Sequence, residues 1–393
     1  MKKRLLYHEI IKQLDHKNAI VITGMRQIGK TTLMKQIFQE LTSPKLWFDF
    51  DNPLDQLLFE DTDYNSIYKH LVSEAGNHHE RLFVFIDEIQ NFPQITTIIK
   101  YFIDHYGVKF IVTGSSNFYL RNLFPESLSG RKFLFVLYPM SFREYLYFKD
   151  DQATPPPIPA SFAANIDQSL YFHEKQFFPY NQYVEFGGFP EVVTTEDVTT
   201  KKMVLKNIFA SFFEKDLNLL SDIKDIRELR NLILLLVPRT GNILDVTRLS
   251  AELGVNRVKI YNYLEFLQGV FFIHLTPKYS KSIDRSVAGG KKVYFSDTGL
   301  LNIIGKTMEG QLFENAVANQ LQHYGSISYY NKRNTSEIDF ILNHDTAIEV
   351  KQTGTPGDYK KLEKTAKELG IEKYYLVSRK YLDLKGFLSP VVI

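Results

Sequence analysis

The chain has 393 residues, with 47 Lys and Arg against 45 Asp and Glu, and it contains no cysteine. This length predicts two or three domains, each long enough to bury a core, and 44% hydrophobic residues are typical of a globular chain. The absence of cysteine excludes a disulfide framework, thiolate metal sites, iron–sulfur clusters and thiol catalysis.

The basic amino-terminal segment is not typical of a signal peptide, because polar and charged residues interrupt what would have to be an unbroken apolar stretch. The interrupting residues are His8, Glu9, Lys12 and Asp15. The most apolar run, residues 232–238, is far shorter than the roughly 20 residues that cross a bilayer. We therefore expect a soluble, cytoplasmic protein that makes no contact with a membrane.

Residues 1–145 alternate short apolar runs with amphipathic stretches of helical length, which predicts an α/β fold with a parallel sheet and crossover helices. We assign residues 1–164 to this first domain. Each predicted strand except the last is followed by a polar or glycine-containing loop, where α/β proteins bind ligands. The predicted strands are Ala19–Thr23, Leu46–Phe50, Leu82–Asp87, Phe110–Gly114 and Phe133–Leu137.

The rest of the chain divides into three further predicted domains. Residues 165–237 are helix-prone and form a helical lid, interrupted by a turn at Gly187 and Gly188. Residues 238–304 form a winged helix-turn-helix, and residues 305–393 form a smaller α/β domain. The elements expected there are a helix over 312–324, strands over 338–342, 347–351 and 373–377, and a helix over 359–369.

A phosphate-binding motif follows the first predicted strand. Residues 24–31 fill the pattern G-x-x-x-x-G-K-[ST], between an apolar run and an amphipathic helix. The two glycines let the backbone curl so that its N–H groups point at phosphates, at the positive end of the next helix. Lys30 would reach the β- and γ-phosphates and the Thr31 hydroxyl would bind Mg²⁺. The predicted ATP-binding residues here are Gly24, Met25, Arg26, Gln27, Ile28, Gly29, Lys30, Thr31 and Thr32.

An acidic pair at the end of the third strand completes the predicted site. Asp87 would hold Mg²⁺ through water, and Glu88 would polarise the attacking water. Since hydrolysis needs a water-positioning group besides the metal ligand, this pair indicates an ATPase and not merely a nucleotide binder.

Two more residues are candidates for the same site, each with a structural alternative. Ser115 follows the fourth strand and would sense the γ-phosphate, or it is only part of a polar strand end. Arg131 is an arginine finger, acting in cis or in trans, or a surface salt-bridge residue.

These motifs together resemble those of prokaryotic AAA-superfamily ATPases that carry a C-terminal domain of unknown function with a restriction-endonuclease-like fold. The resemblance covers nearly the whole chain. It implies an AAA-type core, ATP as the nucleotide, a helical lid and a winged helix. The motifs are residues 24–32, 85–90, 113–116, 128–131, 138–144 and 187–191. The family's usual sensor asparagine is replaced here by Ser115 or Ser116.

Residues 245–267 read as two short helices joined by a glycine turn at Gly254, with the apolar stripe Ile260, Leu264 and Leu267 on the second. Residues 255–292 contain seven basic and two acidic residues. Lys259 and Asn262 would point away from the stripe toward DNA, bound mainly through its phosphates. The alternative is that this module only packs against the ATPase or another subunit.

The C-terminal domain carries a second set of acidic residues. Period-2 alternation places Glu349 and Lys351 on one face of a strand, Asp339 lies on the preceding strand, and Glu314 lies on an earlier helix. This order resembles the PD-(D/E)XK nuclease pattern, in which such residues bind Mg²⁺ and orient water for phosphodiester cleavage. A retained binding function without cleavage is the alternative.

The sequence therefore predicts a Mg²⁺-dependent ATPase coupled to a C-terminal half that binds DNA, and it leaves open whether this half also cleaves DNA. The alternative is a nucleotide-gated switch that binds a protein partner and cleaves nothing. Oligomerisation is compatible with both.

Overall fold

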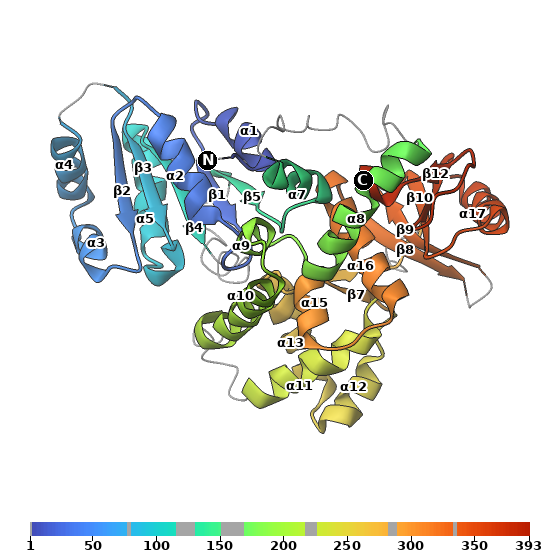
Figure 1. Ribbon diagram of the computed structural model, residues 1–393. Helices are drawn as coiled ribbons and strands as arrows, with labels where there is room; N and C mark the ends of the chain where they lie inside the picture. Colours follow the sequence, from blue (N-terminus) through green and yellow to red (C-terminus); the bar gives the residue numbers. More distant parts are fainter. Residues whose placement is uncertain are drawn as a thin grey trace. The chain divides into compact units, whose positions relative to one another are not determined.

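The structure is a computed structural model that describes residues 2–76, 80–114, 130–150, 169–216, 226–281, 289–332 and 336–393 (Figure 1). The chain divides into two compact units, Met1–Tyr138 with Gly269–Phe271, and Pro139–Gln268 with Phe272–Ile393. The division into four domains stays a prediction. Ser115 and Ser116 lie outside the described residues.

The first unit is built on a five-stranded sheet in which every pairing is parallel. All five predicted strands are confirmed to within one residue at either end. The spatial order β2-β3-β4-β1-β5 places β4 between β1 and β3. The strands are β1 (Ala19–Thr23), β2 (Lys45–Asp49), β3 (Phe83–Asp87), β4 (Lys109–Gly114) and β5 (Lys132–Val136).

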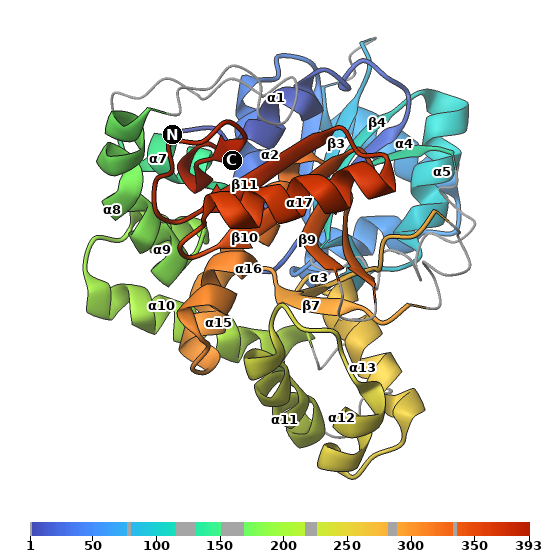
Figure 2. The ribbon, with the colours of Figure 1, turned by 90° about the vertical axis from the view of Figure 1, so that its right-hand side faces the viewer.

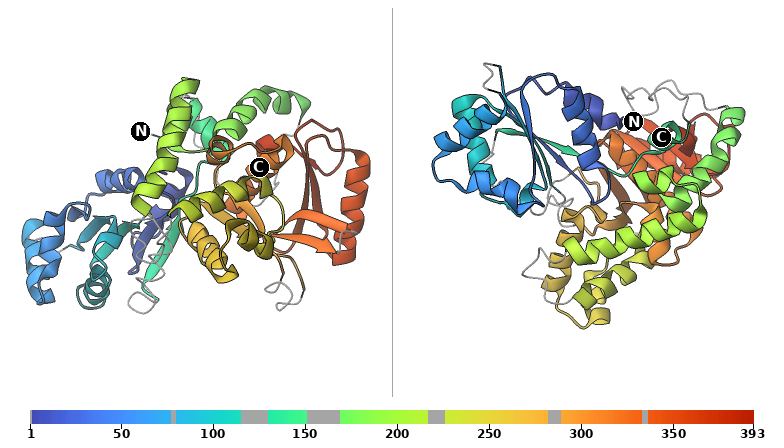
Figure 3. Two further views of the ribbon diagram at one scale, coloured as in Figure 1. Left: turned by 90° about the horizontal axis from the view of Figure 1, so that it is seen from below. Right: turned by 60° about the vertical axis from the view of Figure 1, so that its left-hand side comes forward.

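Helices cover both faces of this sheet (Figure 3). The apolar residues of α4 and α5 form one core with Val84, Ile86 and Val112, and the Phe38 ring on α2 packs against Phe85, which points to the opposite face. Burial on both faces explains why β1, β3 and β4 are continuous apolar runs. The helices are α1 (Leu5–Ile11), α2 (Lys30–Glu40), α3 (Pro53–Leu57), α4 (Tyr64–Glu74) and α5 (Ile95–Tyr106).

The second unit begins with helices, of which α7 precedes the range 165–237 that was predicted to be helical and α8 to α11 lie within it. The chain turns where α8 ends at Gly187, because the buried Asp297 carboxylate lies against this glycine and accepts a hydrogen bond from Gly188 N at 2.7 Å. A side chain at Gly187 would overlap Asp297. The helices are α7 (Phe142–Lys149), α8 (Leu170–Phe186), α9 (Pro190–Thr194), α10 (Val198–Ser211) and α11 (Ile226–Leu236).

Two helices and a β-hairpin follow. The Asp245 side chain caps α12 (Val246–Leu253), and Gly254 ends it in the left-handed conformation before α13 (Arg257–Gly269) begins. The predicted stripe on α13 is buried. Strands β6 (Ile273–Thr276) and β7 (Lys292–Phe295) then pair antiparallel.

A second five-stranded sheet occupies the C-terminal part of this unit, in the order β12-β11-β10-β9-β8. Its edge strands β8 and β12 were missing from the sequence prediction. Helix α17 crosses one face of the sheet (Figure 2). The remaining elements are α15 (Thr298–Ile304), α16 (Glu309–Leu321), α17 (Pro356–Leu369), β8 (Ile327–Lys332), β9 (Ser336–Leu342), β10 (Thr346–Lys351), β11 (Lys373–Ser378) and β12 (Phe387–Leu388).

No helix in the described part of the chain is long and apolar enough to cross a bilayer.

Gly24 is required where β1 meets the end of β5. Its φ of +146° is unfavourable for other residues, and a Cβ atom there would lie 2.2 Å from the carbonyl oxygen of Leu137. Leu137 N in turn donates to Thr23 O at 2.7 Å, which fixes the backbone on both sides.

We expect Gly24→Ala to lower the free energy of unfolding of the first unit by about 3 kcal/mol or more, because backbone atoms must move. Gly107→Ala is the matched control: Gly107 is also left-handed, but a Cβ atom there meets nothing within 4 Å. The control should cost only about 1 kcal/mol. Trp47 is the single tryptophan and lies on β2, so urea denaturation followed by its fluorescence reports on this unit. Equal costs for the two variants would contradict the prediction.

Candidate functional site

The predicted phosphate-binding loop lies between β1 and α2. Gln27 and Gly29 both have positive φ, so the backbone curls before the helix begins at Lys30. The Lys30 ammonium is buried and donates to the carbonyl oxygens of Gly24 and Met25 at 3.0 and 2.8 Å. Thr31 is half-buried and Thr32 is exposed.

Arg4 supports this loop from the amino-terminal segment, and the sequence analysis missed it. Its buried guanidinium donates to Ile28 O at 3.2 Å and to Tyr138 O at 2.8 Å. Because Ile28 belongs to the loop and Tyr138 follows β5, Arg4 ties the loop to the sheet. A single arginine far from the motif gives no sequence signal for this contact.

The acidic pair lies at the same edge of the sheet as the loop, as predicted. Asp87 is buried at the end of β3, and its carboxylate is hydrogen-bonded to the hydroxyls of Thr113 and Thr31. Burial raises the pKa of Asp87, although both hydroxyls act in the opposite direction. Since Thr31 and Asp87 lie together and both present oxygen atoms, the donor set fits Mg²⁺.

Glu88 follows in the left-handed conformation, with φ of +54°. Its backbone N–H donates to Thr113 Oγ1 at 3.1 Å, and its carboxylate accepts a hydrogen bond from the Gln90 side chain. Thr113 thus contacts both residues of the acidic pair, from the strand between β1 and β3. The sequence analysis did not predict a role for Thr113, because it considered only the serine after this strand as a γ-phosphate sensor.

Arg131 is not brought to the loop of its own chain. It immediately precedes β5, and its carbonyl accepts a hydrogen bond from Ala19 N at the start of β1, whereas the loop follows the end of β1. Its guanidinium pairs with Asp104 at 2.8 Å. This geometry excludes the cis position for an arginine finger and leaves the trans position as a prediction.

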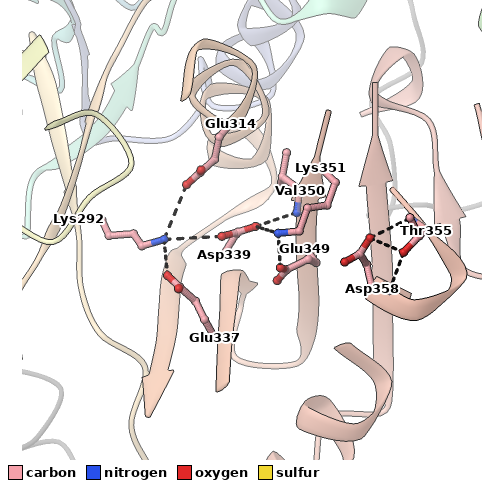
Figure 4. Close-up of polar contacts among 9 residues, drawn as sticks. All are labelled: Lys292, Glu314, Glu337, Asp339, Glu349, Val350, Lys351, Thr355 and Asp358. Carbon is pink, nitrogen blue, oxygen red and sulfur yellow. Dashed lines mark hydrogen bonds and ion pairs between the residues drawn. The ribbon is translucent and has the colours of Figure 1, made fainter. Parts of the chain in front are cut away.

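The second unit brings together the predicted carboxylates and lysine of the C-terminal domain (Figure 4). Asp339 on β9 accepts a hydrogen bond from Val350 N on β10 at 2.9 Å. Lys351 donates to Glu349 at 2.5 Å and lies 3.9 Å from Asp339. Glu314 projects from α16 toward the same place. These contacts agree with the prediction that Glu349 and Lys351 lie on the same face of β10.

Three further residues complete this cluster without having been predicted. Lys292 on β7 lies 3.0 Å from Glu337, 3.7 Å from Asp339 and 3.8 Å from Glu314. Tyr294 donates to Glu314 at 2.6 Å. Glu337 precedes Asp339 by two residues, and this spacing, which places both on one face of a strand, can be seen in the sequence. Lys292 offered no such signal, because in sequence it is only one of the basic residues of the segment 255–292.

Burial sets the ionisation of the cluster. Burial and the neighbouring Asp339 raise the pKa of Glu349 to about 8 and that of Glu314 to about 7. Burial opposes the charge of both lysines, but the carboxylates outweigh it and raise the pKa of Lys292 and of Lys351. Both ammonium groups therefore stay charged near neutral pH.

The cluster suits a divalent cation in residue type but not in arrangement. Within the described ranges, no three His, Asp or Glu side chains are placed so that they could hold a metal ion. The two ammonium groups lie between the carboxylates instead. Metal chemistry at this cluster therefore requires the side chains to rearrange.

Residues 16–146 match a family model described as an AAA domain. This part of the chain is similar to AAA domains. The match agrees with the complete phosphate-binding motif and with the parallel sheet that carries it. Two further models, both described as domains of unknown function, match residues 178–309 and 309–386.

Two relatives of this chain match it over most of its length. An uncharacterised protein of Methanocaldococcus jannaschii is 27% identical, over 98% of this chain and 87% of the relative. An uncharacterised protein of Haemophilus influenzae is 26% identical, over 85% of this chain and 81% of the relative. Among solved structures, a Walker-type ATPase of Pyrococcus abyssi aligns at 14% identity with a TM-score of 0.48, over 77% of this chain and 97% of that one.

We expect Thr113→Val to destabilise the first unit by about 2 kcal/mol, because it leaves the buried Asp87 carboxylate and the Glu88 N–H each without one hydrogen bond. Thr113→Ser keeps the hydroxyl and should cost clearly less. Urea denaturation followed by Trp47 fluorescence measures both variants. A serine variant as unstable as the valine variant would show that the methyl group matters and the hydroxyl does not.

Proposed function

We propose that the chain binds ATP with Mg²⁺ at the P-loop and hydrolyses it. The observation that supports this most directly is the meeting of Thr31, Asp87 and Glu88 beside the loop, although they come from α2 and from the end of β3. Lys30 and the loop N–H groups would bind the phosphates, and Thr31 and Asp87 would hold Mg²⁺. Bound Mg²⁺ would supply charge neutralisation at the phosphate oxygens.

Glu88 is the proposed water-polarising base. Thr113 fixes its backbone, and Gln90 holds its carboxylate, so the side chain must leave Gln90 to reach a water molecule. Ser115 as a sensor and Arg131 of a neighbouring subunit as an arginine finger are parts of the same proposal.

We expect Lys30→Ala to abolish nucleotide binding, because the loop loses the ammonium that contacts the phosphates. Glu88→Gln should bind ATP but hydrolyse it at least about a hundredfold more slowly, the usual contribution of a general base. Lys35→Ala is the matched control, since Lys35 is exposed on the same helix as Lys30. Binding of a fluorescent ATP analogue and phosphate release measure these effects. Parental turnover in Glu88→Gln would remove Glu88 from the mechanism.

We also propose that the C-terminal half binds DNA through α13 and the adjacent hairpin. Supporting this, α12 and α13 have the expected helix–turn–helix order, and Arg257, Asn262 and Lys291 are exposed. The expected role of Lys259 changes, because it pairs with Glu228 on α11. Lys292 likewise points into the carboxylate cluster and is not available to phosphates.

Cleavage of DNA by Asp339, Glu349 and Lys351 is the stronger form of this proposal, with Glu314 as a further carboxylate. The second candidate is a nucleotide-gated binding module without cleavage, which acts on DNA or on a protein partner. The two ammonium groups among the carboxylates favour the second candidate, because they occupy the space between the oxygen atoms that a metal ion would need. A helical lid and an oligomeric state are compatible with both candidates.

A gel-shift series on short duplex DNA tests DNA binding. Affinity should fall between about 50 and 200 mM salt, and Arg257→Ala and Lys291→Ala should each reduce the salt slope by about 1. Lys364→Ala is the control, as an exposed lysine on α17. Absence of any shift at low salt would favour a protein partner.

A plasmid-nicking assay with Mg²⁺ or Mn²⁺ tests cleavage. If the cluster is catalytic, Asp339→Ala and Lys351→Ala should eliminate nicking and leave ATP turnover nearly unchanged, because the two sites lie in different units. Asp345→Ala is the matched control, since Asp345 adjoins β10 but pairs outside the cluster with Lys373. No nicking by the parent with any tested metal would exclude the nuclease and leave the ATPase untouched.

A further inference from the structure

The side chain of Lys292 is only 5% exposed, and its ammonium lies among three carboxylates. The three carboxylates come from different elements: Glu314 from α16, and Glu337 and Asp339 from β9. Figure 4 shows the Lys292 ammonium at the point where these side chains converge.

The backbone holds Lys292 in this position. Asn315, next to Glu314 on α16, accepts a hydrogen bond from Phe295 N at 2.8 Å and donates to Phe295 O at 2.7 Å. Asn315 is fully buried, so this pair of bonds fixes β7 against α16. On the other side, Tyr329 of β8 donates to Gly290 O at 2.6 Å. The ammonium is thus delivered to the carboxylates by a strand that is anchored at both ends.

The charge balance of the cluster explains what the ammonium does there. Glu314, Asp339 and Glu349 are largely buried beside two ammonium groups, whereas Glu337 is 45% exposed, and burial disfavours a carboxylate that has no counter-charge. Lys351 contacts Glu349 and Oδ2 of Asp339, and Lys292 lies near Oδ1 of Asp339. One oxygen of Glu349, Oε2, is buried and receives no hydrogen bond from the described residues. The cluster therefore has one oxygen atom without a hydrogen bond, but the Lys292 ammonium lies among the carboxylates.

We propose that Lys292 is the resident cation of this cluster and that a divalent metal ion binds there only in exchange for its ammonium group. The inference rests on the proposed function, in which the same carboxylates are metal ligands. It follows that Lys292 makes the cluster unresponsive to metal ions as long as the ammonium stays in place. Its flexible four-carbon side chain allows the exchange while β7 remains anchored.

Titration of the full chain with Mn²⁺ in the absence of nucleotide tests the exchange. Lys292→Met keeps the length of the side chain but removes the competing charge, so it should bind Mn²⁺ at least tenfold more tightly than the parent. Lys292→Arg keeps the charge and should show no gain. Lys373→Met controls for the loss of a lysine, because Lys373 is exposed and pairs with Asp345. Adding Asp339→Ala to Lys292→Met should abolish the gain, which assigns the binding to this cluster.

Thermal unfolding gives an independent measurement. Lys292→Met should melt below the parent without metal and recover with Mn²⁺, whereas the parent should not respond. If Lys292→Met folds only with Mn²⁺, that rescue supports the exchange equally, and failure of Mn²⁺ to restore folding overturns it.

The outcomes separate this inference from the proposed nuclease. Tighter Mn²⁺ binding by Lys292→Met with no cleavage in any variant excludes the nuclease and supports the exchange. Unchanged affinity in Lys292→Met, or an equal gain in Lys373→Met, overturns the exchange whether or not the parent cleaves DNA.

Discussion

The parallel pairing of five buried strands is the constraint on which the first unit depends. Because all strands run in one direction, the loop after β1 and the polar ends of β3 and β4 meet at one edge of the sheet. This alone brings Lys30, Asp87 and Thr113 together from segments that are far apart in the sequence. The same direction places Arg131, which precedes β5, at the opposite edge.

In the second unit, the C-terminal site depends on the compensation of buried charge. The carboxylates of Glu314 on α16 and Asp339 on β9 are largely buried, where an unpaired charge is costly. Lys292 and Lys351 reduce this cost from two sides. The hairpin that carries Lys292 is therefore tied to β9 by charge and to α16 by the Asn315 amide.

The two sites differ in the groups that contact their central aspartate. Asp87 is satisfied by two threonine hydroxyls, and Asp339 by a backbone N–H and two lysines. The difference matters for chemistry. Hydroxyl groups are themselves oxygen ligands for a cation, whereas ammonium groups compete with a cation for the carboxylate oxygens.

The sequence by itself determined the P-loop, the acidic pair, the five strands of the first sheet and the D…E-x-K order of β9 and β10. These features depend on local spacing and on the periodicity of apolar residues, which a single sequence displays. It could not determine the partners of Thr113, Arg4 and Lys292, or the edge at which Arg131 lies. Such contacts join residues that are distant in the chain, and a polar residue looks the same in sequence whether it faces solvent or a buried carboxylate. Only the packing of strands and helices decided them.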